Sequence, residues 1–291
     1  MSTTNAAESS AHGRGEMQDR ADSDREFFVG LGRASAGALI FATPTLMTME
    51  LWWTGFYISP WRLVVLIVAT IPLLTGLSMV NGFKRTETLR DDIVDAFVAI
   101  VVAAVVSAAV LFAFGVVTFD RPASEVIGRV ALQAFPASIG AMLSRSQVSG
   151  ERPETEHGGR PPSYGRALAL MAVGALFFGL NLAPTDEIQM LAYQMSPWRE
   201  LALMLLSLAL MHASVYGVAA SGGAKARHGT VSWKLFLRVT VVGYAVVLLL
   251  SFYLLWLFGR TDDTGPAALL SAVVVLGFPC AIGAAAARVI L

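Results

Sequence analysis

Eight long apolar stretches constrain the fold of this chain more than any other feature. An α-helix needs about 20 mostly apolar residues to cross the roughly 30 Å hydrocarbon core of a bilayer. Eight stretches come close to this length: 34–53, 63–80, 93–117, 126–143, 167–183, 201–218, 235–258 and 267–290. Their apolar residues are continuous and do not alternate, which favours helices over a β-barrel. The sequence therefore predicts an all-α polytopic membrane protein with eight transmembrane helices.

The composition supports this class and excludes others. Apolar residues make up 55% of the 291 residues and charged residues 14%, whereas soluble domains carry roughly 25% charged residues. Lys plus Arg equals Asp plus Glu at 21 each, so the basic surplus of a nucleic-acid-binding protein is missing. The single cysteine, Cys280, excludes a disulfide framework and a multi-cysteine metal site. We expect no metal, cofactor or nucleic acid, and the lipid bilayer as the main partner.

Two polar segments divide the chain. Residues 1–33 are rich in charged residues and hold few large apolar side chains. Such a segment buries too little apolar surface to offset the entropy lost on ordering. We therefore predict that it is a disordered cytoplasmic tail. Residues 147–166 combine Gly, Pro and charge, which predicts a flexible cytoplasmic linker. The remainder forms two membrane parts, 34–146 and 167–291, each with four predicted helices.

The positions of Lys and Arg predict the orientation. With the N-terminus inside, 16 of these residues fall on the inner side and 5 on the outer side. Short cytoplasmic loops are typically enriched in Lys and Arg. We therefore predict that both termini are cytoplasmic.

Comparison of the chain with itself indicates a tandem duplication. Residues 37–62 align without a gap with residues 174–199, at an offset of 137 and with 10 identities in 26 positions. Residues 132–145 align with 275–288, at an offset of 143 and with 6 identities in 14. Because the two pairs of similar segments occur in the same order in each half, we predict two parallel four-helix repeats. Such repeats are related by an axis along the membrane normal, and a solute path would lie between them.

Both repeats contain the sequence SPWR. Ser followed by Pro favours a helix start, so helices are predicted to begin at Pro60 and Pro197. The Trp and Arg side chains that follow suit the outer membrane interface. A structural role explains every part of this motif. The predicted interface anchors are Trp61, Arg62, Trp198 and Arg199.

Both repeats also contain the pattern FPxxIGA near their ends. Pro136 and Pro279 are predicted to kink the fourth and eighth helices, because proline frees a backbone carbonyl. Gly140 and Gly283 follow one turn later, and small residues let neighbouring helices approach closely. The kinks serve packing alone, or they act as hinges that turn a carbonyl toward a water-filled path.

Charged residues inside a span are costly and are candidate sites. Glu50 and Glu187 occupy matching positions in the two repeats, and Asp186 precedes the second. Paired carboxylates bind a cation or share a proton, because neighbouring negative charges raise one pKa. We predict an ion site at Glu50, Glu187 and Asp186. The alternative is a set of hydrated carboxylates at the outer boundary of the membrane.

Three further polar residues are candidates for gating or relay. Asp95 lies near the start of the third predicted helix, where an acid also favours the helix dipole. Arg238 falls at the corresponding place in the second repeat, so the two side chains are predicted to meet as an inner gate. His212 lies within the sixth predicted helix and is a candidate proton relay. Its alternative role is a hydrogen bond to a neighbouring carbonyl or hydroxyl.

The third predicted helix carries a stripe of small residues. Ala99, Ala103 and Ser107 follow one another at four-residue spacing, with Ala104 and Ala108 beside them. Such spacing is typical of close helix contacts. It predicts contact between the halves, or with a second copy in a homo-oligomer.

The repeated SPWR, the acid before it and the FPxxIGA helix together resemble a bacterial integral-membrane protein family of unknown function. The resemblance covers about residues 27–291. It implies a location in the bacterial inner membrane and supplies no catalytic residue, substrate or cofactor.

Two functions remain open at this point. The duplicated helices and the matching acids favour a transporter or channel for protons or small cations between the repeats. The small-residue faces and the long tail suit a membrane scaffold, or a partner of other envelope proteins, that transports nothing. Phosphate-binding loops and the motifs of intramembrane proteases and metal hydrolases are missing, so we do not expect an enzyme.

Overall fold

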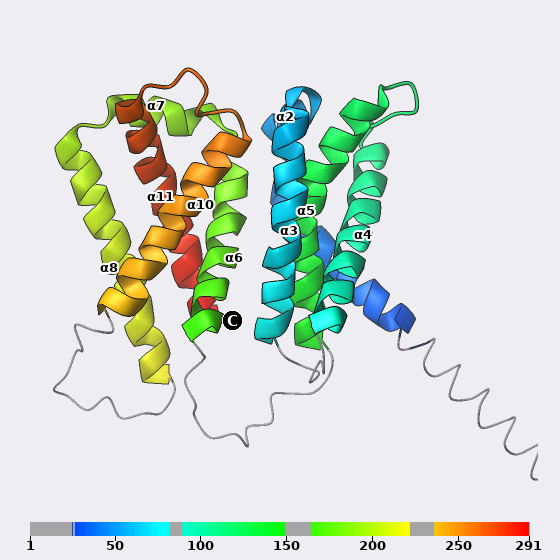
Figure 1. Ribbon diagram of the computed structural model, residues 1–291, viewed down its shortest axis with the longest axis horizontal. Coiled ribbons are helices and arrows are strands. Elements are labelled where there is room, and N and C mark those ends of the chain that lie inside the picture. Colours follow the sequence, from blue (N-terminus) through cyan, green and yellow to red (C-terminus); the bar gives the residue numbers. More distant parts are fainter. Residues whose placement is uncertain (1–24, 26, 82–88, 149–163, 222–235, 291) are drawn as a thin grey trace, which may run out of the picture.

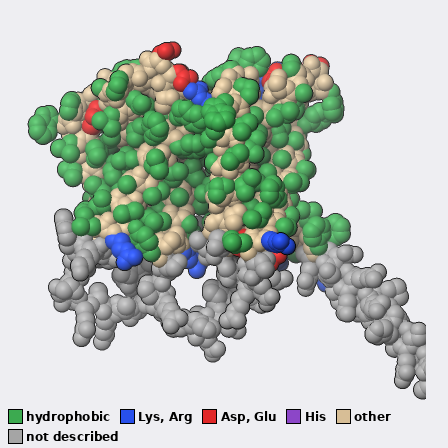
Figure 2. Space-filling view, in the orientation of Figure 1, with side chains coloured by type: hydrophobic (Ala, Val, Ile, Leu, Met, Phe, Trp, Pro, Cys, Tyr) green, Lys and Arg blue, Asp and Glu red, His purple; other side chains and the backbone are tan. Residues whose placement is uncertain are grey.

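The computed structural model describes residues 25, 27–81, 89–148, 164–221 and 236–290. Within these ranges the chain forms helices and no strands. Seven of these helices are long and apolar enough to cross a membrane. Apolar side chains cover the middle of the visible face, and charged side chains gather toward its two ends (Figure 2). The predicted all-α fold with several membrane-spanning helices is therefore confirmed.

The first half consists of four long helices and one short helix. The first long helix covers Phe27–Leu46. The short α2 (Met49–Tyr57) follows, and then α3 (Pro60–Asn81), α4 (Leu89–Ala113) and α5 (Ala123–Val148). The helix start predicted at Pro60 is confirmed.

The second half has the same order of long and short helices, with one irregular turn. A short π-helix, η1, leads directly into α10, and α8 begins at Pro197 as predicted. The elements are α6 (Tyr164–Leu182), α7 (Asp186–Gln194), α8 (Pro197–Ser221), η1 (Phe236–Val241), α10 (Val242–Leu257) and α11 (Pro266–Ile290).

Some predicted boundaries were wrong. Residues 34–53 were predicted as one span, but the chain breaks after Leu46 and α2 begins at Met49. The indole Nε1 of Trp52 donates to the Leu46 carbonyl oxygen at 3.0 Å, so a side chain satisfies a carbonyl at the end of the first helix. The first helix also begins at Phe27, inside the predicted tail. Residues 1–24, 26 and 149–163 of the predicted tail and linker lie outside the described residues.

Each half is organised around its last helix. α5 packs against α2, α3 and α4, and α11 packs against α6, α7, α8 and α10. Figure 1 shows the two resulting groups of helices side by side. The small-residue stripe on α4 is used inside the first half, because Ala99, Ala103 and Ser107 are fully buried there.

Glycines allow two especially close helix contacts. A Cβ added to Gly140 on α5 would overlap the carbonyl oxygen of Gly37 on the first helix. A Cβ added to Gly283 on α11 would likewise overlap the carbonyl oxygen of Gly174 on α6. The close approach predicted at Gly140 and Gly283 is therefore present in both halves.

The halves meet along α3 of the first half and α6 and α10 of the second. The rings of Phe41 and Phe177 pack edge to face, with their centroids 4.7 Å apart. At the end of the molecule that carries α2 and α7, Arg62 Nη2 bonds Asp262 Oδ1 at 2.5 Å. Apolar and charged contacts thus join the two groups of helices.

Candidate functional site

A set of polar side chains lies between α8, η1, α10 and α11 in the second half. At one level, the Nδ1 atom of His212 on α8 lies 3.0 Å from the hydroxyl oxygen of Thr240 on η1. Thr240 is fully buried, and the Phe236 ring packs edge to face on the imidazole. The structure therefore gives His212 the hydroxyl partner that was one of its two predicted roles.

At the next level, Tyr244 on α10 points its hydroxyl toward α8 and α11. Tyr244 is 4% exposed, and its hydroxyl lies close to that of Ser207. The Ser207 hydroxyl itself donates to the Leu203 carbonyl oxygen at 2.8 Å. Among the described residues, the Tyr244 hydroxyl makes no hydrogen bond of normal geometry. An unsatisfied buried hydroxyl costs about 1–3 kcal/mol, so its retention calls for an explanation.

At the third level, Glu200 lies near the start of α8 and is half-buried. The hydroxyl of Ser271 on α11 donates to Glu200 Oε1 at 2.5 Å. The Glu200 carboxylate is therefore bound by a side chain of α11 and lies partly buried inside the second half.

We call Glu200, Ser207, His212, Thr240, Tyr244 and Ser271 the polar line. Along α8, Ser207 is seven residues after Glu200 and His212 is five residues after Ser207. At 1.5 Å per residue these steps are about 10 Å and 8 Å. The polar line therefore extends over about 18 Å of the axis of α8, in two steps longer than a hydrogen bond.

The predicted ion site is distributed over two short helices. Glu50 lies in the first turn of α2, and Asp186 and Glu187 lie in the first turn of α7. Both helices lie at the same end of the molecule, in different halves (Figure 1). Among the described residues, no group of three or more His, Cys, Asp or Glu side chains is placed to hold a metal ion.

Asp186 has a structural partner. Arg260 Nη1 bonds Asp186 Oδ1 at 2.6 Å, and its Nη2 also donates to the Pro184 carbonyl oxygen. Gln189 Nε2 donates to the Arg260 carbonyl oxygen at 3.1 Å. The loop after α10 is therefore attached to α7 through Arg260.

The structure does not bring Asp95 and Arg238 together as an ion pair. Asp95 is half-buried on α4. The Arg238 guanidinium lies over the ring of Tyr164 on α6, 4.9 Å from its centroid. The Tyr164 hydroxyl donates to the Arg238 carbonyl oxygen at 2.8 Å. Arg238 thus attaches η1 to the start of α6.

The predicted interface anchors differ in their surroundings. Trp61 and Trp198 are 66% and 81% exposed, and Arg199 is also exposed, as expected of side chains that face lipid headgroups. Arg62 instead points into the contact between the halves. Besides bonding Asp262, its guanidinium lies 5.5 Å from the centroid of the Trp256 ring.

We expect the Arg62–Asp262 bridge to contribute to the contact between the halves at neutral pH. The Arg62 hydrogen bond lowers the pKa of Asp262 below its ordinary value of 3.8. A lowered pKa in the folded state gives stabilisation above the unfolded pKa that is lost as the pH falls through the folded pKa. Because Asp262 is exposed, the contribution is at most about 1 kcal/mol. Comparing the thermal unfolding of wild type and Asp262→Asn at pH 7 and below pH 3.8 tests this. A difference that persists unchanged in acid would contradict it.

The two prolines lie inside continuous helices. α5 contains Pro136 and α11 contains Pro279, and both helices remain helical on either side. The Phe135 carbonyl oxygen accepts a hydrogen bond from the Ser138 hydroxyl at 2.7 Å. The helix kinks expected at Pro136 and Pro279 stay a prediction.

Sequence reasoning missed most of the polar line. Glu200 was placed just outside the sixth predicted span, although α8 begins three residues before it. Tyr244 was read as one more apolar residue of its span. A search for polar side chains that occur in only one of the two repeats would have found Glu200 and Tyr244. At the offset of 137, for example, the residue that corresponds to Glu200 is Leu63.

Comparison with known proteins gives a family for the chain. A search of curated proteins and a search of solved structures gave no match. A family model described as "Putative integral membrane protein (DUF2391)" matches residues 30–291. These residues include every helix described above except the first residues of the N-terminal helix. The chain therefore belongs to the DUF2391 family of integral membrane proteins.

Proposed function

We propose that the chain moves protons across the membrane along the polar line of the second half. The observation that carries this proposal is the Tyr244 hydroxyl, which is buried at the middle of the line without a full hydrogen bond among the described residues. Glu200 stands at one end and His212 at the other. Intramembrane carboxyl and imidazole groups are the usual elements of proton relays.

The chemistry of the polar line favours protons over metal cations. Calcium takes six to eight oxygen ligands, often from carboxylates, and no three His, Cys, Asp or Glu side chains of the described residues are grouped to hold a metal ion. Single hydroxyl, carboxyl and imidazole groups each accept and donate one proton. The steps of about 10 Å and 8 Å between levels require bridging water when the path conducts.

We place the route inside the second half, although the duplication had suggested the space between the repeats. The described contacts between the halves include the Phe41–Phe177 ring pair and the Arg62–Asp262 bridge. Glu50 and Glu187 then have a different role. As acids at one end of the molecule, they raise the local concentration of cations at the mouth of the path.

We further propose that the chain spans the membrane eight times as two parallel four-helix repeats. α8 supplies the eighth span, since its 25 residues extend about 37 Å, enough to cross the hydrocarbon core. The Gly37–Gly140 and Gly174–Gly283 contacts support the duplication, because their members are related by the offsets of 137 and 143. Gly115 and Gly259, each at positive φ after α4 and α10, support an offset of 144 between these helices.

The family resemblance supports a location in the bacterial inner membrane, and the distribution of Lys and Arg supports an orientation with both termini in the cytoplasm. The end that carries α2 and α7 then faces outward. We assign the chain no enzymatic reaction. A reporter protein that is active only in the cytoplasm, fused after Leu291, tests the orientation.

Purified protein in liposomes tests the transport proposal. An inward proton gradient is imposed, and an internal pH-sensitive dye reports its decay, with K⁺ and Ca²⁺ gradients measured in parallel. We expect proton flux above that of empty liposomes and no flux of the two metal ions. The absence of proton flux would overturn the proposal and favour the non-transporting scaffold.

A further inference from the structure

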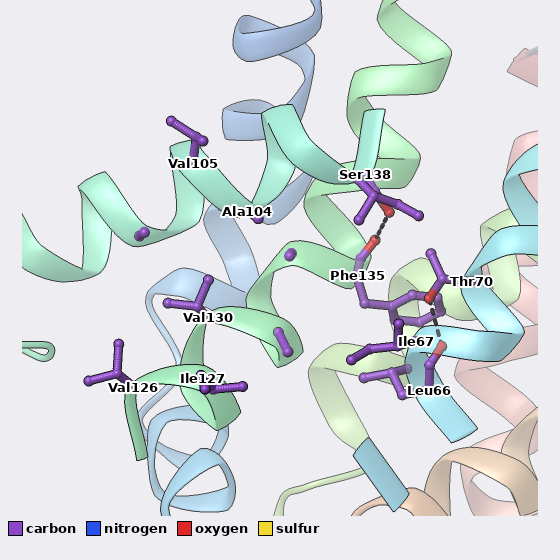
Figure 3. A pocket seen from close by; sticks show the side chains of 14 residues that line it. Leu66, Ile67, Thr70, Ala104, Val105, Val126, Ile127, Val130, Phe135 and Ser138 are labelled. Carbon is purple, nitrogen blue, oxygen red and sulfur yellow. Dashed lines mark hydrogen bonds between the residues drawn. The ribbon is translucent and has the colours of Figure 1, made fainter. Parts of the chain in front are cut away.

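A groove between α3, α4 and α5 opens on the outer surface of the first half (Figure 3). Its volume is about 520 Å³. Leu66 and Phe135 form a buried floor, whereas Val105 and Ile127 at the rim are 64% and 58% exposed. In a membrane-spanning helix an exposed apolar side chain faces lipid, so the groove is open to the hydrocarbon of the bilayer.

The side chains that line the groove give water few hydrogen-bonding partners. Its two hydroxyls, on Thr70 and Ser138, donate to carbonyl oxygens of their own helices at 2.7 Å each. The remaining lining side chains are apolar. A water molecule needs two to four polar partners to occupy a cavity, so an apolar occupant is favoured.

The outer end of the groove lies next to a charged loop. Val126 and Ile127 line the groove, and Arg121 lies five residues before Val126, in the loop that leads into α5. Arg121 Nη1 bonds Glu125 Oε1 at 2.7 Å, yet its side chain remains 39% exposed. Arg121 also precedes the first residue of α5, so it lies at the depth of lipid headgroups. Guanidinium groups bind phosphate through paired hydrogen bonds.

We propose that this groove binds a phospholipid of the outer leaflet, with an acyl chain along α5 and the phosphate at Arg121. The lining residues of α5 run from Val126 to Ser138, which is about 18 Å of helix. One leaflet contributes about half of the roughly 30 Å hydrocarbon core. The groove therefore matches the depth of one leaflet, and its mouth lies at the headgroup level.

The second half carries larger side chains at the positions that correspond to this groove. At the offset of 144, Ala104 and Ala108 correspond to Leu248 and Phe252. Leu248 fills the space beside α11, since its Cδ2 atom lies 2.9 Å from a Cβ added to Gly277. This comparison rests on the proposed duplication, whereas the groove in the first half does not.

Lipid retention tests the proposal directly. Purified protein is stripped of lipid, incubated with phosphatidylethanolamine or with diacylglycerol, and analysed by native mass spectrometry. Ala104→Leu places in the groove the side chain found in the second half, and Ala109→Leu adds the same volume at an exposed position of α4. We expect wild type and Ala109→Leu to retain one more phosphatidylethanolamine per chain than Ala104→Leu.

Arg121→Gln provides a second test that leaves the groove intact. We expect this variant to retain several-fold less phosphatidylethanolamine and an unchanged amount of diacylglycerol, which has no phosphate. Equal phospholipid retention by wild type, Ala104→Leu and Arg121→Gln would overturn the proposal. A wild-type dimer that Ala104→Leu converts to a monomer, with no change in lipid, would overturn it in favour of a second copy of the chain.

Discussion

Gly283→Ala is expected to destabilise the second half, although it adds a single methyl group. The new Cβ would overlap the Gly174 carbonyl oxygen and would lie 2.7 Å from Phe178 Cδ2. Because the first of these atoms belongs to the backbone, α6 and α11 must move apart to accept the methyl group. Overpacking of this kind costs about 1–3 kcal/mol. Gly174→Ala is expected to act in the same way, since its Cβ would overlap the Gly283 carbonyl oxygen.

Thermal unfolding of the detergent-solubilised protein measures this effect. Gly76→Ala on α3 is the matched control, because no atom lies within 4 Å of its added Cβ. Ala is favoured over Gly in a helix by up to about 1 kcal/mol, so the control is expected to keep or raise the unfolding temperature. An unchanged unfolding temperature in both Gly174→Ala and Gly283→Ala would contradict the close contact between α6 and α11.

Tyr244→Phe is expected to lower the proton flux at least tenfold without a loss of stability. The substitution removes one oxygen atom from the middle of the polar line and keeps the ring that packs between the helices. Positioned proton donors and acceptors typically change rates by about 10²–10⁴-fold. Removing a buried hydroxyl that lacks a full hydrogen bond also removes a cost of about 1–3 kcal/mol, so unfolding is expected at the same or a higher temperature.

Tyr253→Phe is the matched control for Tyr244→Phe. Both residues lie on α10, and neither hydroxyl makes a hydrogen bond of normal geometry among the described residues. They are nine residues apart, which places them on opposite faces of the helix. The Tyr253 ring lies 6.2 Å from that of Trp256, away from the polar line. A similar loss of flux in both variants would show that Tyr244 has no special place in the path.

Local patterns predicted much of the fold. Continuous apolar runs gave the long helices, and the Ser-Pro pairs gave the starts of α3 and α8. The break before α2 was missed, because Leu46, Met47 and Met49 were read as part of one span that ends at Trp52 and Trp53. The hydrogen bond from Trp52 to the Leu46 carbonyl oxygen helps to stabilise the break, and composition does not reveal a bond of this kind.

The site depended on contacts between residues far apart in the chain. Glu200 and Ser271 are 71 residues apart, and Asp186 and Arg260 are 74 apart. A single sequence gives no signal for such pairs. Matching positions in the repeats therefore drew attention to Glu50 and Glu187, whereas the polar line belongs to one repeat and depends on tertiary packing.

Proton flux in liposomes that contain paired variants tests the central claim most directly. One variant combines Glu200→Gln with His212→Gln and removes both titratable ends of the polar line. The other combines Glu50→Gln with Glu187→Gln and removes the matching acids of α2 and α7. If protons move through the second half, the first variant loses proton flux and the second retains most of it. Loss in the second variant with full flux in the first would contradict the route proposed for this chain.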